Sequence, residues 1–249
     1  MRELWLIGIG AGSPNHITLQ ARQALCAAGL ILLPTKGADK SALAALRRRI
    51  IADSGASAPV IEFDYPVRAP ELPYAQAVDR WHDEIARRWQ SALAGRRLKG
   101  PVALLVWGDP SLYDSSLRIA ERLNPKPRIR MLPGISALQA LTCAHAIPCN
   151  TLGGEVTVTT GRRLRERGWP RDARSVVVML DGACSFQTLD AADTHIWWGA
   201  YLGMDEQLLE RGPLAEAAPR IVAARAAARA RHGWIMDTYL LRRTAGVGG

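Results

Sequence analysis

The sequence contains no long hydrophobic run. Arg, Gly, Asp or Pro interrupts every apolar stretch before it reaches the roughly 20 residues that a membrane-spanning helix needs. The first residues, Met1-Arg2-Glu3, lead straight into the apolar segment Leu4-Trp5-Leu6-Ile7-Gly8, which is typical of a short strand and unlike a secretion signal. Because 48% of the 249 residues are hydrophobic, the chain can still bury a large core. We therefore expect a globular cytoplasmic protein with no membrane partner.

Cysteine and histidine are scarce and scattered. The four cysteines show no Cys-x-x-Cys spacing, and a chain of this length does not depend on disulfides for its stability. None of the five histidines stands at helical ligand spacing beside a glutamate, which argues against a zinc hydrolase. The sequence therefore predicts reduced thiols and no bound metal.

The charge is unbalanced toward arginine. The formal net charge is +9, and several arginines stand next to one another, as in Arg47-Arg48-Arg49 and Arg162-Arg163. Such an excess fits nucleic acid or a polyanionic small molecule as partner, and solvated helix faces are a third explanation. The sequence has no basic stripe interleaved with aromatic residues and no recognised RNA-binding motif. Charge alone leaves these alternatives open.

Short aliphatic runs alternate with longer amphipathic segments along the whole chain, which is the pattern of an α/β protein. We expect strands at residues 4–9, 30–34, 60–63, 102–107, 129–132, 155–159, 176–180, 195–200 and 233–241. Helices are expected at residues 19–28, 41–52, 74–94, 116–122, 136–144 and 205–210, besides an Ala/Arg-rich helix near the C-terminus. A Pro-bearing stretch at residues 124–127 separates two halves. The sequence therefore predicts two α/β lobes, residues 1–114 and 115–243, and a tail, residues 244–249.

The first of three glycine loops is Gly8-Ile9-Gly10-Ala11-Gly12-Ser13-Pro14, at the end of the first expected strand. A nicotinamide dinucleotide site needs Gly-x-Gly-x-x-Gly and an acidic residue at the end of the next strand. Ser13 takes the place of the third glycine, and the second strand ends in Leu32-Leu33-Pro34 without a carboxylate. Both departures argue against a nicotinamide-dependent reductase.

The second and third loops are Trp107-Gly108-Asp109-Pro110-Ser111-Leu112-Tyr113 and Leu132-Pro133-Gly134-Ile135-Ser136-Ala137. Glycine allows a ligand to approach the backbone, and Asp109 offers an acceptor for hydroxyl or ammonium groups. Ser136 and the first free amides of the following helix face the same sheet edge. Open α/β sheets bind ligands at the carboxyl ends of their strands. Each loop alone is a common turn, but the three in this order predict one ligand site.

In this order and at these separations, the loops resemble those of the tetrapyrrole (corrin) methylases, a family of S-adenosylmethionine-dependent methyltransferases. The resemblance extends from Trp5 to about Leu241. It implies two α/β lobes with the active site in the cleft between them, and a homodimer. It also implies S-adenosylmethionine as methyl donor, S-adenosylhomocysteine as product and a polycarboxylate tetrapyrrole, a precorrin, as substrate. Two positions depart from the family pattern, since Ala11 replaces its usual proline and Ser13 its usual acidic residue.

By motif, the resemblance places the cofactor against residues of all three loops and against a second group farther along the chain. The loop residues are Ala11, Trp107, Gly108, Asp109, Leu112, Ser136 and Ala137. The second group consists of Leu180, Tyr201, Trp234 and Ile235, whose surroundings carry no sharp motif.

Within the family, four longer segments are similar to members that methylate a precorrin and release its acetyl group as acetate. These segments are residues 34–41, 105–115, 179–187 and 231–237. Removal of an acetyl group needs an activated water and a donor to the developing oxyanion. The candidates beside the loops are His16, Lys36 and Tyr113, with Asp39 behind them, although each could instead have a structural role or contact a substrate carboxylate.

The positive charge has a use in this interpretation, because arginine pairs with carboxylates in a two-pronged fashion. The candidate carboxylate partners are Lys36, Lys40, Arg118, Arg162 and Arg163. No nucleic-acid partner is then expected. Two alternatives stay open: a corrin methylase that acts at another ring carbon, and an RNA-binding or RNA-directed protein.

Overall fold

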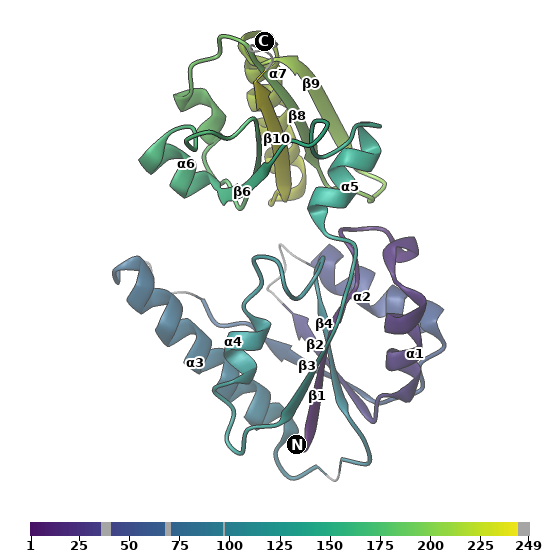
Figure 1. Cartoon of the computed structure of the whole chain (residues 1–249). Helices are drawn as coiled ribbons and strands as arrows, with labels where there is room; N and C mark the ends of the chain where they lie inside the picture. Colours follow the sequence, from purple (N-terminus) through teal and green to yellow (C-terminus); the bar gives the residue numbers. More distant parts are fainter. Residues whose placement is uncertain (36–40, 68–70, 97, 244–249) are drawn as a thin grey trace. The chain divides into compact units, whose positions relative to one another are not determined.

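The computed structural model describes residues 1–35, 41–67, 71–96 and 98–243 (Figure 1). The chain divides into two compact units, Met1–Ser136 and Ala137–Gly249. Each unit has its own five-stranded sheet and its own hydrophobic core. The predicted α/β fold with two lobes is therefore confirmed.

The sheet of the first unit consists of parallel strands in the order β3-β2-β4-β1-β5. The strands are β1 (Glu3–Gly8), β2 (Leu30–Thr35), β3 (Val60–Asp64), β4 (Val102–Val106) and β5 (Arg128–Leu132). The connecting helices are the 3-10 turn η1 (Pro14–His16), α1 (Leu19–Ala27), α2 (Ser41–Ser54), α3 (Tyr74–Leu93) and α4 (Ser116–Ala120). Thr18 caps α1 as predicted, since its hydroxyl oxygen accepts the Ala21 N–H at 3.1 Å.

Helices cover both faces of this sheet, so its central strands are apolar throughout (Figure 1). Successive side chains of β1 lie on opposite faces of the sheet. Leu4 and Leu6 join the core beneath α3 and α4, whereas Trp5 and Ile7 join the core beneath α1 and α2. The continuous apolar runs that identify these strands in the sequence follow from this double burial.

The second unit contains a mixed sheet in the order β6-β7-β10-β8-β9. Its strands are β6 (Val156–Thr160), β7 (Ser175–Met179), β8 (Thr194–Ala200), β9 (Leu208–Pro213) and β10 (Asp237–Arg243). β6 and β7 are parallel, and β10 lies antiparallel between β7 and β8. The helices are α5 (Ala137–Ala144), α6 (Gly161–Arg167), the 3-10 turn η3 (Ser185–Thr188) and α7 (Leu214–His232). α7 packs on β8 and β9 and buries Leu214, Ala217 and Ile221.

Most predicted strands and helices are confirmed with small differences at their ends, but two predictions are wrong. The helix expected at residues 205–210 is absent, because Leu208–Pro213 forms β9 with the alternating exposure of a strand. The last strand begins at Asp237 and not at residue 233, because Gly233 ends α7. Its backbone is left-handed with φ +74°, and its N–H bonds to the carbonyl of Arg229. Helix α6 was not predicted.

The two units divide later in the chain than the predicted boundary at residue 114. β5 pairs with β1, with Ile129 opposite Leu4 and Leu132 opposite Ile7, and α4 packs against α3 and β1. Residues 115–136 therefore belong to the first unit. The Pro-bearing stretch at residues 124–127 connects α4 with β5 inside that unit and is not an interdomain linker.

None of the described helices is both long enough and apolar enough to cross a membrane.

A fragment that ends at residue 136 should fold alone, whereas one that ends at residue 114 should not. The shorter fragment lacks β5 and the core residues Ile119, Leu123 and Leu132, so it exposes the β1 edge and opens both cores. Thermal unfolding followed by circular dichroism tests this. A cooperative transition is expected for residues 1–136 only, and an equally cooperative transition for residues 1–114 would contradict the corrected boundary.

Candidate active site

The three glycine loops meet at the carboxyl edge of the first sheet. Residues 9–14 follow β1, residues 107–113 follow β4 and residues 133–136 follow β5, and β1 lies between the other two strands. Beyond the ends of the strands, Gly10 and Gly108 form a further backbone pair. The Gly108 N–H donates to the Gly10 carbonyl at 2.8 Å, and the Gly10 N–H donates to the Gly108 carbonyl at 3.2 Å. The first two loops are thus hydrogen-bonded to each other.

The backbone of the third loop packs directly against the backbone of the other two loops. A Cβ atom on Gly8 would lie 2.6 Å from the Gly134 nitrogen, and one on Gly134 would lie 2.2 Å from the Gly108 carbonyl oxygen. Both distances are well under the 3.0 Å that real Cβ atoms keep. Only glycine allows this approach, so the glycines of the sequence motifs determine how the loops meet.

Asp109 links the second loop to the third. Its Oδ1 accepts the Ser111 N–H at 2.8 Å and also the Ser111 hydroxyl, while its Oδ2 accepts the Gly134 N–H at 2.9 Å. Burial opposes ionisation, but these hydrogen bonds outweigh it and lower the pKa of the Asp109 carboxyl. Both carboxylate oxygens are therefore engaged with the protein itself. The sequence suggested Asp109 as a hydrogen-bond acceptor for a ligand. Its contacts show that it holds the second and third loops together.

His16 lies against the first loop, in η1. The Cβ position of Gly10 would be 2.2 Å from the Cβ of His16, so the two residues are in direct contact. Burial lowers the pKa of His16, and the imidazole is neutral at pH 7. Among the described residues its buried Nδ1 has no hydrogen-bond partner. His16 therefore offers one unused ring nitrogen beside the loop junction.

The other predicted residues of the first unit differ in exposure. Ala11, Gly108 and Ser136 are buried, and Trp107 and Leu112 are half-buried. Tyr113 is 42% exposed and has a positive φ of 50°, which is uncommon for a residue with a bulky side chain. Lys36, Asp39 and Lys40 lie outside the described residues. Arg118 is exposed on α4, where its Nη1 donates to the Asp114 carbonyl at 3.0 Å.

The four residues predicted later in the chain gather at one end of the second sheet. Leu180 follows β7, Tyr201 follows β8, and Trp234 and Ile235 precede β10, which runs antiparallel to both. The Tyr201 hydroxyl donates to the Trp234 carbonyl at 2.5 Å, and the two rings meet edge to face with their centroids 5.0 Å apart. Tyr201 is buried, whereas Leu180 is 67% exposed. Ala137, the remaining residue, begins α5.

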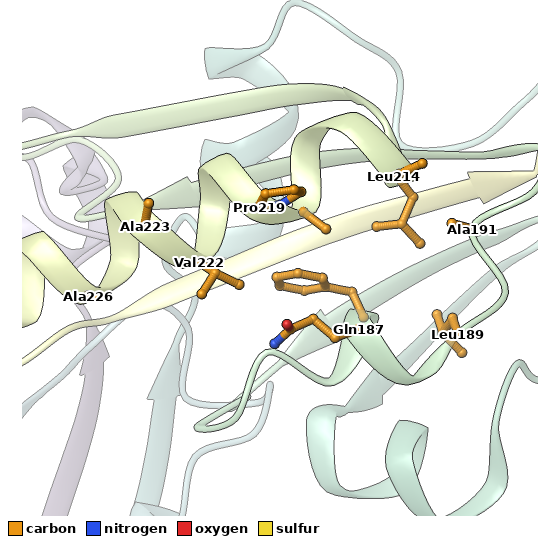
Figure 2. A pocket seen from close by; sticks show the side chains of 11 residues that line it. Gln187, Leu189, Ala191, Leu214, Pro219, Val222, Ala223 and Ala226 are labelled. Atoms are coloured by element: carbon orange, nitrogen blue, oxygen red, sulfur yellow. The ribbon is translucent and has the colours of Figure 1, made fainter.

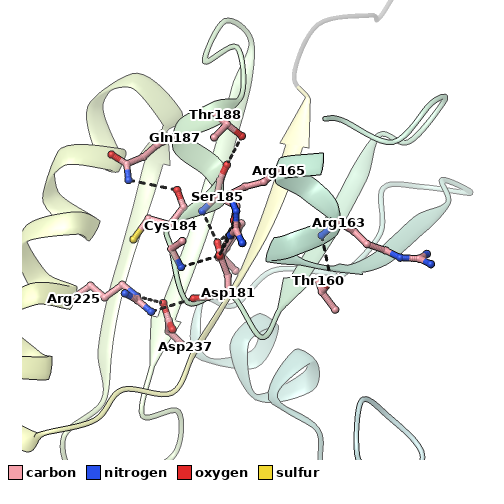
Figure 3. Close-up of polar contacts among 12 residues, drawn as sticks. Thr160, Arg163, Arg165, Asp181, Cys184, Ser185, Gln187, Thr188, Arg225 and Asp237 are labelled. Atoms are coloured by element: carbon pink, nitrogen blue, oxygen red, sulfur yellow. Dashed lines mark hydrogen bonds and ion pairs between the residues drawn. The ribbon is translucent and has the colours of Figure 1, made fainter. Parts of the chain in front are cut away.

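A buried carboxylate fixes the turn that carries Leu180. Leu180 has a φ of +54°, a costly conformation for a bulky side chain. The neighbouring Asp181 accepts the Ser185 N–H at 2.6 Å and the Tyr239 hydroxyl at 2.7 Å on Oδ2, and the Ser185 hydroxyl at 2.7 Å on Oδ1 (Figure 3). Arg225 donates to the Asp181 carbonyl at 3.1 Å. An exposed apolar side chain on a strained turn that buried bonds hold in place indicates a functional surface.

Two of the expected carboxylate partners lie at the same end of the second sheet. β6 is parallel to β7, so α6 begins beside the turn after β7, and Arg162 and Arg163 stand in its first turn. The Thr160 hydroxyl accepts the Arg163 N–H at 3.4 Å and caps the helix (Figure 3). A Cβ on Gly161 would lie 2.2 Å from the Asp181 carboxylate, so α6 packs directly on that residue.

Arg47 and Tyr65 also lie at the carboxyl edge of the first sheet, although no sequence motif marked them as site residues. Tyr65 directly follows β3, and the Arg47 guanidinium carbon lies 5.7 Å from the centroid of the Trp107 ring. The position of Tyr65 after a strand was a usable signal. Arg47 was hidden because it stands in a triplet of arginines that looks like a solvated helix face.

An open apolar hollow lies elsewhere in the second unit, between α7 and η3. Its volume is about 560 Å³, and Phe186, Leu189, Leu214, Pro219 and Val222 are among the side chains that line it (Figure 2). No predicted site residue is in this lining, and none of the lining side chains carries a charge. The hollow therefore offers no group for acid–base or nucleophilic chemistry.

Comparison with known proteins places the chain in a family. Residues 3–218 match the family described as Tetrapyrrole (Corrin/Porphyrin) Methylases. The chain belongs to this family, and the resemblance that the glycine loops indicated is confirmed.

Three proteins with similar sequences or structures are informative. The chain is 46% identical to the precorrin-6A synthase [deacetylating] of a Sinorhizobium species, over 98% of this chain and 97% of that one. A cobalamin synthesis related protein (CobF) from Corynebacterium diphtheriae has a similar structure, with a TM-score of 0.84, 40% identity and coverage of 98% and 100%. A uroporphyrin-III C-methyltransferase from Thermus thermophilus, solved with S-adenosylhomocysteine, shares the fold with a TM-score of 0.58 and 16% identity over 97% of each chain.

Substitution of Asp181 by asparagine should destabilise the protein by about 1–3 kcal/mol at neutral pH, because an amide nitrogen would replace an oxygen that accepts hydrogen bonds. Burial opposes ionisation of Asp181, but the bonds from Ser185 and Tyr239 outweigh it and lower the pKa of the carboxyl below the ordinary 3.8. A lowered pKa contributes stability above the unfolded-state value, and that contribution is lost as the pH falls through the folded-state value. The difference between wild type and Asp181→Asn should therefore shrink in acid.

Urea unfolding at neutral pH and at steps below about pH 4 measures this difference. Asp205→Asn, which alters an exposed aspartate before β9, serves as the control and should change little at any pH. A constant difference for Asp181→Asn across the whole range would show that the ionised carboxylate does not support the turn.

Proposed function

We propose that the chain is an S-adenosylmethionine-dependent methyltransferase of cobalamin biosynthesis that methylates precorrin-5, releases its acetyl group as acetate and yields precorrin-6A. The junction of the three glycine loops is the observation that carries the methyltransferase part of this proposal. The particular reaction is supported by the 46% identity to a precorrin-6A synthase [deacetylating] over nearly the full length of both chains.

The loop junction fits S-adenosylmethionine. A Cβ on Gly108 would meet only the Cα of Ser136, at 3.9 Å, so open space adjoins the backbone at the centre of the junction. Half-buried Trp107 and Leu112 offer apolar surface to an adenosine ring, and Ser136 offers a hydroxyl. Bound there, S-adenosylmethionine would supply the methyl group as an electrophile and leave as S-adenosylhomocysteine.

The proposed cofactor residues fall into two groups. Those of the first unit are Ala11, Trp107, Gly108, Leu112 and Ser136, with Asp109 holding the loops in place. Ala137, Leu180, Tyr201, Trp234 and Ile235 are included because the family resemblance implies them. The uroporphyrin-III C-methyltransferase of the same fold was solved with S-adenosylhomocysteine, which is in keeping with this choice of ligand.

The protein's contribution to methyl transfer is mainly positioning. A nucleophilic ring carbon must line up behind the methyl group, and no acid or base is needed at the methyl itself. The Gly10–Gly108 hydrogen bonds and the Gly8–Gly134 contact fix the loops before a ligand arrives. Little conformational entropy then has to be lost when the cofactor binds.

Release of the acetyl group needs water. The bond between the ring carbon and the acetyl carbonyl carbon breaks, the oxygen of water passes into acetate, and the electron pair stays on the ring carbon that takes the methyl group. We propose His16 as the base, because its imidazole is neutral and its Nδ1 has no partner among the described residues. Tyr113 and Lys36 are the further candidates, as donor to the developing oxyanion or as partner of the base.

The remaining expectations follow from the same proposal. The enzyme would work in the cytoplasm, as the composition of the sequence indicates, and it would be a homodimer, as the family resemblance implies. Its positive charge would serve substrate carboxylates and not nucleic acid. A corrin methylase acting at another ring carbon would need the same loops. The high identity to the precorrin-6A synthase favours the deacetylating reaction over that alternative.

Incubation with precorrin-5 and S-adenosylmethionine that carries a deuterated methyl group tests the proposal. Mass analysis should find one labelled methyl on the tetrapyrrole in place of the acetyl group, and acetate should appear in equal amount. A labelled product with its acetyl group intact would instead indicate methylation at another carbon. If no tetrapyrrole is labelled and RNA binds tightly even at high salt, the RNA-directed alternative holds, since non-specific binding weakens steeply with salt.

A further inference from the structure

Side chains from helix α2 and from the segments that follow β3 and β4 gather beside the glycine loops, at the carboxyl edge of the first sheet. β3, β2 and β4 are adjacent, and Tyr65 follows β3 while Trp107 follows β4. Arg47 comes from α2, the helix after β2, and Asp114 comes from the end of the second glycine loop. Arg47 and Asp114 both influence the pKa of Tyr65, although burial is the main cause that raises it to about 12. The Tyr65 hydroxyl therefore stays neutral.

Arg47 lies on the inner face of α2. Ala44 and Ile51, which stand three positions before it and four after it, are both buried, so the three residues form one stripe of the helix. The two arginines that follow point elsewhere. Arg48 pairs with Glu62 at 2.6 Å and Arg49 with Asp53 at 3.6 Å, and both side chains are at least half exposed.

In the described part of the chain no carboxylate oxygen lies within 4.0 Å of the Arg47 guanidinium, and Asp114 acts on its charge only from farther away. Its Nη1 donates to the Leu43 carbonyl at 3.4 Å, and its buried Nε has no hydrogen-bond partner among the residues that the structure describes. Asp114, the nearby carboxylate, accepts the Ser116 N–H at 2.6 Å. Burial lowers the pKa of Arg47, but a guanidinium stays charged in a protein.

A half-buried cation with no carboxylate against it among the described residues is unfavourable for folding, because no close ion pair offsets its loss of hydration. The guanidinium lies 5.7 Å from the Trp107 ring centroid, and Trp107 directly precedes Gly108 of the loop junction. An anion that reached this edge could pair with the planar guanidinium through two parallel hydrogen bonds.

We propose that Arg47 binds a carboxylate on the rim of the tetrapyrrole substrate. This inference rests on the proposed function and names a specificity residue for it. The cofactor also carries a carboxylate, but the cluster around Arg47 lies over β3, β2 and β4, whereas the loop junction lies over β4, β1 and β5. Arg47 therefore belongs to the substrate side of this edge.

Arg47→Gln and Arg49→Gln form a matched pair, because each removes one positive charge from α2 but only Arg47 lies on the inner face. Arg47→Gln should raise KM for precorrin-5 about tenfold or more, the effect of losing a charged hydrogen-bonding partner. It should leave the Kd of S-adenosylhomocysteine, measured by calorimetry, unchanged. Arg47→Lys should recover part of the loss, and Arg49→Gln should behave as wild type.

Thermal unfolding gives a second readout. Removal of a half-buried charge that has no close ion pair among the described residues should leave Tm unchanged or raise it in Arg47→Gln. Substitution of a residue with a purely structural role would lower Tm. A lower Tm together with an unchanged KM would overturn the proposal. So would a weaker S-adenosylhomocysteine Kd with an unchanged KM, because Arg47 would then bind the cofactor.

A direct binding experiment separates this inference from the proposed function. Uroporphyrin, a stable tetrapyrrole polycarboxylate, is titrated into wild type, Arg47→Gln and Arg49→Gln with tryptophan fluorescence as the signal. About tenfold weaker binding to Arg47→Gln alone would support the carboxylate contact even if precorrin-5 proves not to be the substrate. Equal binding to all three proteins would overturn the proposal whatever the outcome of the activity assay.

Discussion

The direct contact of backbone with backbone among three glycine loops is the constraint on which the candidate site depends. Gly8 and Gly134 lie so close that neither position can accommodate a Cβ atom, and Gly10 and Gly108 form two hydrogen bonds beyond the ends of their strands. β1 occupies the centre of this arrangement because it pairs with both β4 and β5. The sheet order thus brings the first loop against two loops that come much later in the chain, with 98 residues from Gly10 to Gly108 and 126 from Gly8 to Gly134, and the glycines let the loops touch.

Carboxylates that hydrogen-bond to the protein itself support the loop junction in the first unit and the turn after β7 in the second unit. Asp109 uses both carboxylate oxygens to hold the second and third loops, and Asp181 does the same for the turn that presents Leu180. In each case an ionised carboxylate accepts hydrogen bonds from backbone amides of the loop or turn that it holds, and the Ser185 amide at Asp181 would otherwise lie buried without this partner. Because these carboxylates bind the protein, the groups available to a proposed ligand are mainly backbone atoms, apolar side chains and hydroxyls. Such a rigid surface suits a reaction that depends on alignment.

The sequence predicted the parts of the fold that carry a strong local signal. Parallel strands buried on both faces give unbroken apolar runs, so β1, β2 and β4 were identified, and the hydroxyl of Thr18 marked the start of α1. β9 was missed because Leu208–Pro213 combines a charged pair with Gly and Pro, and only its pairing with β8 makes it a strand. The unit boundary was misplaced for a similar reason, since the pairing of β5 with β1 is a long-range contact.

The residues of the candidate site were predictable only where they belong to a sequence motif. The glycines of the three loops indicate that backbone approaches backbone there. That the loops meet at one edge was expected because ligands bind at the carboxyl ends of the strands in open α/β sheets. The role of Asp109 as a clamp was not evident, because its partner Gly134 stands 25 residues away. Arg47 was overlooked within its triplet, although its spacing from Ala44 and Ile51 places it on the inner face of α2.

A crystal structure of the protein with S-adenosylhomocysteine tests the central claim most directly. The account predicts that the ligand lies against Gly108, Leu112 and Ser136, with the Gly10–Gly108 hydrogen bonds and the Asp109 contacts unchanged from the structure described above. A ligand bound elsewhere, such as in the apolar hollow beside α7, or loops that separate to admit it, would contradict the claim that the glycine junction is a preformed cofactor site.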